Sequence, residues 1–288
     1  MNVIKNLRKT TYPGIDPLRP ELSTQGCSAL VTGAGTGVGA AIAKALARSG
    51  VSELALLGRT ESTLNQTKAE ISALGLSGKV SIFIADITDP ASLNTAVKAF
   101  AESTSSGKID ILIANAAHMS DLKSIVDLDA IDFWNSFRTT VLGNFHLLQA
   151  FQPVAAPNAS IIHITTAAIV MPYIPGYAAY RSSKIAAYKL FETFFYENPG
   201  FFGLHVHPGL IFGTASSGKF EESLKEAGYG HLQDDISISG DFVVWSVSEQ
   251  ARFLSGRFVS ATWDIEELKS KKADLDKDAT LFTVGLLG

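Results

Sequence analysis

Tyr180 and Lys184 are the two residues whose types and spacing best suit proton chemistry. They lie four positions apart in Tyr180-Arg-Ser-Ser-Lys184, so a helix through this segment would place the phenol and the ammonium on one face. A nearby cation stabilises a phenolate and lowers the pKa of a tyrosine, which starts near about 10. Such a tyrosine can pass a proton to or from a substrate oxygen near neutral pH. The same spacing also fits an ordinary surface pair, so the surrounding fold has to support the chemical interpretation.

A glycine-rich turn near the N-terminus suits the phosphates of a dinucleotide. The segment Val31-Thr-Gly-Ala-Gly-Thr-Gly-Val-Gly39 follows an apolar run and precedes the strong helix formers of residues 40–49. Glycine lets the backbone turn tightly and approach a pyrophosphate, and the helix then presents unpaired N–H groups to the anion. The alternative is a strand-to-helix turn that binds nothing. We favour a phosphate site that comprises Gly33, Thr36, Gly37, Val38 and Gly39.

Short apolar runs alternate with helical patterns along most of the chain. Strands are expected at residues 28–32, 53–57, 79–84, 109–113, 160–165 and 203–207, and helices at about 40–49, 61–74, from Pro90, 130–151 and 176–197. This alternation predicts an α/β fold, a doubly wound parallel sheet of about seven strands with helices on both faces. We expect a surface arm at residues 1–26, a single domain at 27–288, and a mobile substrate lid near 213–240. Ligands bind at the carboxyl ends of such strands.

The overall composition excludes several classes of function. The net charge is −4, and basic residues are dispersed, which gives no electrostatic site for nucleic acid. No apolar run reaches membrane-spanning length, and the chain has a single cysteine, so we expect a cytoplasmic protein. We expect no metal site among the six histidines. We expect His163 to be a core residue and His118 to be structural or solvated.

These motifs, taken in order, resemble the short-chain dehydrogenase/reductase family over about residues 11–268. Thr32-Gly-x-x-x-Gly-x-Gly39 matches the family's cofactor motif, and Ala114-Asn-Ala-Ala117 resembles its Asn-Asn-Ala-Gly turn. The resemblance implies a Rossmann-type fold and a nicotinamide cofactor, which Asp86, Asn115, Ala116, Pro208 and Gly209 would help to bind. The arm and the segment 251–264 resemble a fungal branch whose members often act on secondary metabolites.

The resemblance also implies catalytic roles, with two departures from the family's pattern. Tyr180 would be the general acid/base, and Lys184 would bind the nicotinamide ribose and lower the tyrosine pKa. Thr166 stands where the family has a serine and keeps the hydroxyl. Thr140 stands where the family has an asparagine that supports a proton-relay water, and Asn144, one turn on, is a candidate to compensate.

The second strand predicts which coenzyme binds. NAD sites usually end this strand in an acid that pairs with the ribose 2′-hydroxyl, whereas this chain has Gly58 followed by Arg59. A guanidinium suits a 2′-phosphate, so NADP(H) is favoured over NAD(H). The alternative is a solvated arginine at a strand end.

Apolar segments predict the substrate and the oligomeric state. Residues 169–175 and 210–212 flank the expected site, which indicates a hydrophobic small-molecule substrate. The helix at 176–197 carries aromatic residues on more than one stripe, and in the family such helices pair, so we expect a homodimer or homotetramer. Cover by the C-terminal segment is the alternative.

Three functions remain open at this level. The leading one is an NADP(H)-dependent ketone/alcohol oxidoreductase. The second is a redox-silent member of the fold, such as an isomerase, dehydratase or cyclisation catalyst, which the change at Thr140 would favour. The third is a cofactor-binding regulator without catalysis, which the presence of both Tyr180 and Lys184 disfavours.

Overall fold

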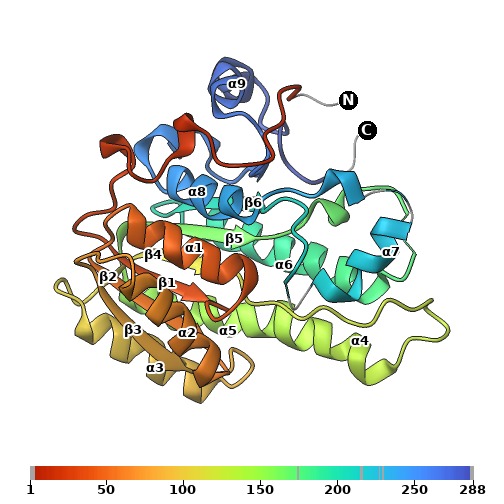
Figure 1. Ribbon diagram of the computed structural model, residues 1–288, viewed down its shortest axis with the longest axis horizontal. Coiled ribbons are helices and arrows are strands. Elements are labelled where there is room, and N and C mark those ends of the chain that lie inside the picture. The colour runs from red at the N-terminus through yellow and green to blue at the C-terminus, as the bar shows by residue number, and fades with distance from the viewer. Residues whose placement is uncertain (1–3, 174, 215–216, 227, 229, 286–288) are drawn as a thin grey trace.

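A parallel sheet lies at the centre of the computed structural model, which describes residues 4–173, 175–214, 217–226, 228 and 230–285 (Figure 1). In this described part the sheet has seven strands in the order β3-β2-β1-β4-β5-β6-β7, and all neighbours pair in parallel. The predicted doubly wound α/β fold is therefore confirmed. The strands are β1 Ser28–Thr32, β2 Glu53–Gly58, β3 Lys79–Ile84, β4 Ile109–Ala114, β5 Ala155–Ile164, β6 Phe202–His207 and β7 Phe258–Ser260. No sequence pattern predicts β7.

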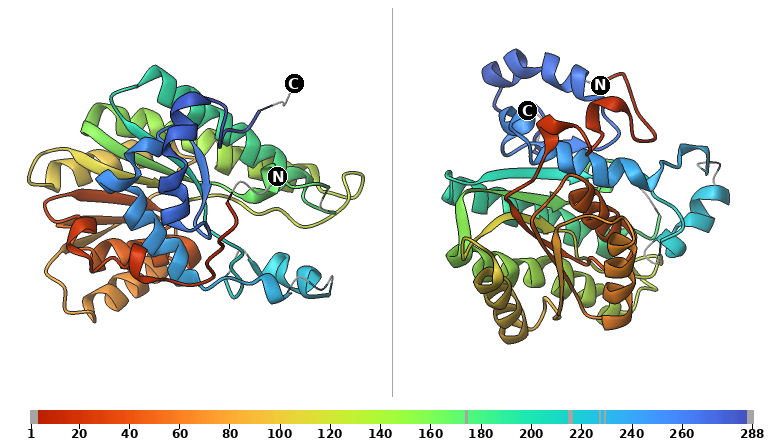
Figure 2. Two further views of the ribbon diagram at one scale, coloured as in Figure 1. Left: turned by 90° about the horizontal axis from the view of Figure 1, so that it is seen from above. Right: turned by 60° about the vertical axis from the view of Figure 1, so that its left-hand side comes forward.

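Helices cover both faces of the sheet and bury two separate apolar clusters, and the views in Figure 2 show these layers. One face packs against α1 (Gly37–Arg48), α2 (Glu61–Ser72) and α8 (Ile236–Ser246). The other packs against α3 (Pro90–Ser103), α5 (Asn144–Phe151) and α6 (Ala178–Glu197). Because the central strands are covered on both sides, most of their residues are apolar, and in β1 every residue is buried.

Side-chain caps set several helix starts. Asp89 accepts hydrogen bonds from the backbone N–H groups of Ala91 and Ser92, and Pro90 follows it at the first helical position of α3. Asp129 caps α4 (Ala130–Phe137) in the same way. The sequence therefore marks both helix starts correctly.

The helix expected at residues 130–151 is not a regular α-helix. It consists of α4, a π-helical turn at Arg138–Gly143, and α5. The side-chain amide of Asn144 donates to the Thr140 carbonyl at 2.8 Å, which supplies a donor at the position where the α-helical ladder widens. The departure from a regular α-helix has a local cause, since the buried side-chain amide of Asn144 competes with the backbone for the Thr140 carbonyl.

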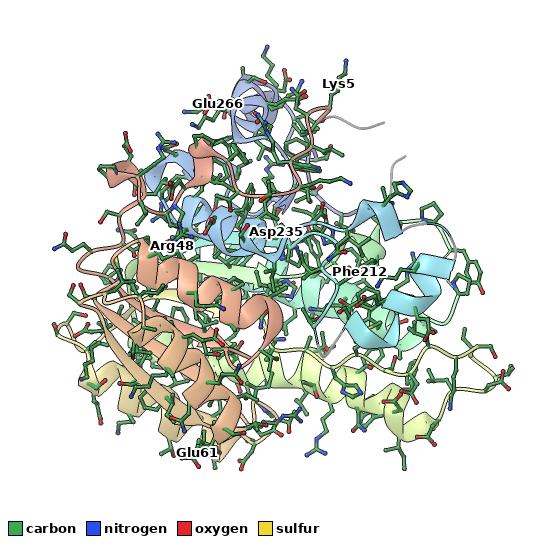
Figure 3. All side chains as sticks on the ribbon, viewed as in Figure 1. Lys5, Arg48, Glu61, Phe212, Asp235 and Glu266 are labelled. Carbon is green, nitrogen blue, oxygen red and sulfur yellow. The ribbon has the colours of Figure 1, made fainter. Side chains whose placement is uncertain are left out.

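The N-terminal arm packs against the C-terminal part of the chain. It contains two short 3₁₀ turns, Pro13–Ile15 and Pro20–Leu22, and Leu7 pairs with Trp263 in an isolated bridge. Arg8 forms an ion pair with Asp264, which caps α9 (Ile265–Ser270), and α10 (Lys272–Lys277) follows. Figure 3 shows Lys5 of the arm and Glu266 of α9 at the top of the molecule, where these segments meet. The predicted arm begins with residues 1–3, which lie outside the described part.

The segment expected to form a mobile lid, residues 213–240, overlaps helix α8 at its end. Residues 236–240 belong to α8, which packs against α1, and the added Cβ of an alanine at Gly240 would lie 2.6 Å from the Ala41 carbonyl oxygen. Between β6 and α8 the chain forms α7 (Glu221–Glu226) and short 3₁₀ turns. Residues 215, 216, 227 and 229 of the expected lid lie outside the described part. Within the described part of the chain, no helix combines the length and the apolar character needed to cross a membrane.

Candidate functional site

A cavity of about 410 Å³ opens at the carboxyl ends of the strands. It runs from the ends of β2 and β3, where Arg59 and Asp86 lie, past the glycine turn after β1 to Tyr180 and Lys184 of α6. Most of the predicted site residues line it: Gly33, Thr36, Gly37, Val38, Gly39, Arg59, Asp86, Asn115, Ala116, Tyr180, Lys184 and Pro208. The sequence motifs from five strand ends therefore converge on one cavity.

The Thr32 hydroxyl joins the ends of β1 and β4 under this cavity. The fully buried Oγ1 donates to the Ile113 carbonyl at 3.2 Å and accepts from the backbone N–H groups of Asn115 at 3.0 Å and Ala116 at 3.1 Å. The Asn115 amide Nδ2 donates back to the Thr32 carbonyl at 2.9 Å. The Asn115 turn is thus fixed against the glycine turn, because few alternatives satisfy these buried groups.

The glycine turn has room for backbone only. A Cβ at Gly39 would lie 2.2 Å from the Gly33 carbonyl oxygen, and a Cβ at Gly35 would lie 2.4 Å from Thr63 Oγ1. Gly33 and Gly37 have φ values of +65° and +54°, which favour glycine. Helix α1 begins at Gly37, so its first N–H groups face the cavity beside the turn. These features fit the pyrophosphate of a dinucleotide.

Tyr180 and Lys184 lie one helical turn apart on α6, as predicted, but they do not form a direct pair. Lys184 Nζ donates to the Ile164 carbonyl at 2.9 Å and lies 6.0 Å from the centre of the Tyr180 ring. Burial lowers the pKa of Lys184 to about 8. Burial also raises the pKa of Tyr180 to about 12, against a smaller lowering by a hydrogen bond with Thr166. The expected lowering of the tyrosine pKa by the lysine is therefore wrong for this structure, because desolvation dominates.

The two threonines at the positions of family departures lie just behind the cavity wall. Thr166 bonds to Tyr180 and accepts from the Ala168 N–H at 3.2 Å, while its neighbour Thr165 lines the cavity with a buried hydroxyl that has no partner among the described residues. Thr140 is buried in the π-helical turn and accepts from the His118 N–H at 3.3 Å. Its neighbour Thr139, rather than Thr140, lines the cavity.

Arg59 and Asp86 face each other at the far end of the cavity. Arg59 Nη1 lies 3.9 Å from Asp86 Oδ2, and the Arg59 side chain is 70% exposed. Asp86 Oδ1 accepts from the Thr88 N–H at 2.8 Å, which fixes the carboxylate. The guanidinium is thus exposed at the end of β2, where a ligand can reach it.

Pro208 lines the cavity, but Gly209 does not. Gly209 has a φ of +103°, and a Cβ there would lie 3.0 Å from Asp234 Oδ2, an oxygen that accepts from the Leu210 N–H. Gly209 therefore shapes the turn, and Pro208 faces the cavity.

The apolar wall of the cavity differs from the expected one. None of the described residues in 169–175 lines it, and Val170, Met171 and Tyr173 are exposed, while Ile174 lies outside the described part. Met119 and Phe220 line it instead. Met119 belongs to a small cluster with Ala168 and Tyr177, against which Phe220 packs. No periodic pattern marks these residues, because both lie in loops.

His118 is a further cavity residue that the sequence analysis set aside. Its ring Nε2 lies 2.9 Å from Asp132 Oδ1, so its side chain has a carboxylate partner. The sequence feature that could have identified His118 as a cavity residue is its position directly after the Asn115 turn. Among the described residues, no group of three or more histidine, cysteine or acidic side chains is arranged to hold a metal ion.

Comparisons with known proteins agree with this geometry. A family model described as short chain dehydrogenase matches residues 28–199. The chain is 29% identical to a short chain dehydrogenase/reductase of Claviceps purpurea, over 98% of this chain and 94% of that protein. It is also 29% identical to the short chain dehydrogenase/reductase nsrO of Aspergillus novofumigatus, over 91% of this chain and 89% of that protein. A crystal structure of a short chain dehydrogenase from Burkholderia cenocepacia in complex with NADP is similar, with a TM-score of 0.73 and 25% identity over 82% of this chain and 96% of that one.

Proposed function

The chain belongs to the short-chain dehydrogenase/reductase family, and we propose that it is an NADP(H)-dependent enzyme that interconverts a ketone and a secondary alcohol. The observation that carries this proposal is the placement of Tyr180 and Lys184 in the same cavity as the glycine turn at residues 33–39. The substrate we propose is a hydrophobic small molecule of the secondary-metabolite type. The apolar residues Met119 and Phe220 in the cavity wall and the fungal relatives support this class.

The nicotinamide cofactor, when bound, supplies or accepts the hydride. The glycine turn at residues 33–39 and the start of α1 would hold the pyrophosphate, since several glycines there bring the backbone to the cavity without side chains. Asp86, Asn115 and Ala116 would flank the adenosine and ribose portions, and Pro208 would face the nicotinamide. Family members bind such a cofactor, and the cavity lining extends from Arg59 to Tyr180, so it could hold the adenosine at one end and the nicotinamide at the other.

Tyr180 would donate a proton to the substrate oxygen during reduction. Burial holds the phenol protonated, because its pKa is raised to about 12. Thr166 would orient the phenol through their hydrogen bond. Lys184, close by and buried, would exchange its bond to the Ile164 carbonyl for bonds to the cofactor ribose.

Arg59 supports a preference for NADP(H) over NAD(H). Its guanidinium is exposed at the end of β2 and is held near Asp86. A planar guanidinium binds a 2′-phosphate through paired hydrogen bonds, and no acid stands at Gly58 to bind a 2′-hydroxyl. The NADP complex of the Burkholderia relative supports the same choice.

The test combines cofactor binding with turnover. Purified protein is titrated with NADPH and NADH by calorimetry, and NADPH oxidation is then followed with 2-tetralone, 2-decalone and the polar ketone acetoin. We expect tighter binding of NADPH than of NADH and turnover of the apolar ketones. Tyr180→Phe should abolish turnover and leave NADPH binding intact, whereas the control Tyr173→Phe, at an exposed tyrosine outside the cavity, should be active. Undiminished turnover by Tyr180→Phe would refute the assignment.

A redox-silent catalyst of the same fold is the second candidate. Thr140 and the π-helical turn favour it, because the family's asparagine is absent at this position. Tight NADPH binding with no oxidation across a broad ketone panel, together with conversion of a substrate at constant NADPH absorbance, would select this function.

We also propose that the protein is a homodimer or homotetramer. Ile131 and Trp134 of α4, Leu142 of the π-helical turn and Phe145 of α5 are exposed apolar side chains along one continuous helical stretch. The C-terminal segment covers Tyr188 of α6, whose hydroxyl accepts from the Val284 N–H at 3.2 Å, but leaves Tyr196 exposed. Light scattering after size-exclusion chromatography tests this, and a mass near 30.7 kDa would contradict it.

A further inference from the structure

We infer that His118, oriented by Asp132, carries protons between the cavity of Tyr180 and bulk solvent. The inference rests on the proposed function, because it concerns the resupply of the proton that Tyr180 donates. It makes His118 a proton-transfer residue and Asp132 a positioning residue.

His118 is held in a defined orientation from both ends. Its backbone N–H donates to Thr140 Oγ1 at 3.3 Å, which ties the residue to the π-helical turn. Its ring Nε2 lies 2.9 Å from Asp132 Oδ1. The second oxygen of Asp132 accepts from the Asp121 N–H at 2.7 Å, so the carboxylate that orients the ring is itself fixed. An imidazole fixed by a carboxylate is a common proton-transfer arrangement in enzymes.

The position of His118 connects the cavity with water. It lines the cavity together with Tyr180 and Lys184, and its side chain is 30% exposed. The strand order places β4, which His118 follows, beside β5 and hence beside α6 after it. Of the six histidines, all of which lie in the described residues, only His118 lines the cavity.

The other titratable groups of the cavity wall are poorly placed for this exchange. Lys184 is buried and Tyr180 is partly buried, and desolvation raises the pKa of Tyr180 to about 12 and lowers that of Lys184 to about 8. Arg59 and Asp86 lie at the opposite end, after β2 and β3, beyond the glycine turn. The phenol loses one proton per turnover, and His118 is a partly exposed imidazole in the wall of the same cavity.

The proposed exchange conserves protons and moves no redox electrons. After Tyr180 has given its proton to the substrate oxygen, a cavity water gives a proton to the phenolate oxygen, and protonated His118 replaces it from Nδ1. The ring then takes a proton from solvent. Because Asp132 accepts at its oxygen, it keeps the other proton on Nε2, which leaves Nδ1 as the exchanging nitrogen. In alcohol oxidation the same steps run in reverse. The groups beside this path are Asp132, whose oxygen contacts the His118 ring, and Tyr180 and Lys184 in the cavity wall.

Pre-steady-state kinetics separate this role from a structural one. His118→Gln and Asp132→Asn are compared with wild type in rapid mixing of the full chain with NADPH and 2-tetralone. Tyr180 begins protonated, so we expect the first turnover to proceed at the wild-type rate in both variants. Later turnovers should slow at least about 10-fold in His118→Gln, which gives a burst of one NADPH per active site. Added imidazole should bring the rate of the later turnovers of His118→Gln back toward the wild-type rate.

Controls keep the result interpretable. His146→Gln removes a partly buried histidine that bonds to the Ile87 carbonyl and does not line the cavity, and it should show no burst. NADPH affinity and thermal midpoint should match wild type in the variants. An activity-independent readout is ¹⁵N-histidine NMR of the cofactor-free protein, in which His118 should carry its proton on Nε2 and should lose this preference in Asp132→Asn.

Each outcome decides between the assignments. Unchanged later turnovers in His118→Gln, or equal slowing of first and later turnovers without imidazole rescue, overturns the role of His118. Loss of NADPH binding or of folding in His118→Gln, with Asp132→Asn behaving as wild type in every turnover and in the NMR spectrum, also overturns it. A wild-type protein that binds no NADPH defeats the proposed function itself.

Discussion

The buried histidine pair of β5 and β6 predicts a loss of stability in mild acid. His163 and His205 are cross-strand neighbours, their Nδ1 atoms lie 3.1 Å apart, and both are almost completely buried. Phe191 stacks on His163, and the Tyr188 ring lies 4.0 Å from that of His205, centre to centre. A hydrogen bond between two Nδ1 atoms needs one ring to donate and the other to accept, so it is lost when both rings are protonated, and burial disfavours protonation of either ring.

The magnitude follows from the two pKa values. Burial lowers the pKa of His205 to about 3, and burial together with His205 and Lys184 lowers that of His163 well below its usual range. In the unfolded chain each histidine titrates near about 6.5. Stability is therefore complete above that pH and falls as the pH drops toward the folded values, because the unfolded chain binds more protons. At pH 5.5 each histidine costs about 1.4 kcal/mol, or about 3 kcal/mol for the pair.

Urea unfolding followed by circular dichroism at pH 7.5, 6.5 and 5.5 measures this loss, and the range stays above the usual carboxyl pKa values. His205→Phe should reduce the pH dependence by about a third whatever its stability at pH 7.5, because it removes one of three histidines whose pKa burial lowers, the third being His207 at about 4. The His205 site is already surrounded by aromatic rings. The control His231→Gln, at an exposed histidine, should keep the wild-type dependence. An unfolding free energy that is flat from pH 7.5 to 5.5, or a His205→Phe dependence equal to wild type, would refute the reasoning.

Three further predictions concern the cavity. Thr32→Val removes three hydrogen bonds and should lower the unfolding free energy by about 3 kcal/mol, whereas Thr32→Ser keeps them and should cost about 1 kcal/mol; equal losses in denaturant titrations would contradict the role of the hydroxyl. Arg59→Asp should weaken NADPH binding by about 10-fold or more and favour NADH relatively, because it sets a second carboxylate near Asp86; unchanged calorimetric affinities would exclude Arg59 from coenzyme selection. Gly39→Ala should weaken NADPH binding about 100-fold, since its methyl would lie 2.2 Å from the Gly33 oxygen, and wild-type affinity would show that the pyrophosphate lies elsewhere.

Local sequence patterns predict most of the sheet and of the cavity. The apolar runs place six of the seven described strands, because a strand buried on both faces tolerates few polar residues. The glycine spacing and Tyr180-x-x-x-Lys184 place two opposite walls of the cavity, because each depends on backbone geometry within a few residues. Strand β7 has three residues, too short for a pattern of its own.

Features that depend on contacts between distant residues were missed. The Nδ1 contact of His163 and His205 needs the register of β5 with β6, which no local pattern specifies. The bond between His118 and Asp132 spans a loop and a helix start, and each residue alone has an ordinary solvated alternative. The π-helical turn depends on the side chain of Asn144, in a segment whose helical pattern is otherwise continuous.

The same limit explains the error about the pKa of Tyr180. Spacing on a helix correctly brings a cation near the phenol, but the pKa depends on how much water both groups lose, and desolvation dominates for both. With Lys184 bonded to the Ile164 carbonyl, the phenol is held in its protonated form, which is the form that a reductase needs at the start of a turnover. Return of the proton then requires a path from solvent rather than a low pKa at Tyr180. A cavity wall that includes a partly exposed, carboxylate-bound His118 supplies a candidate for that path.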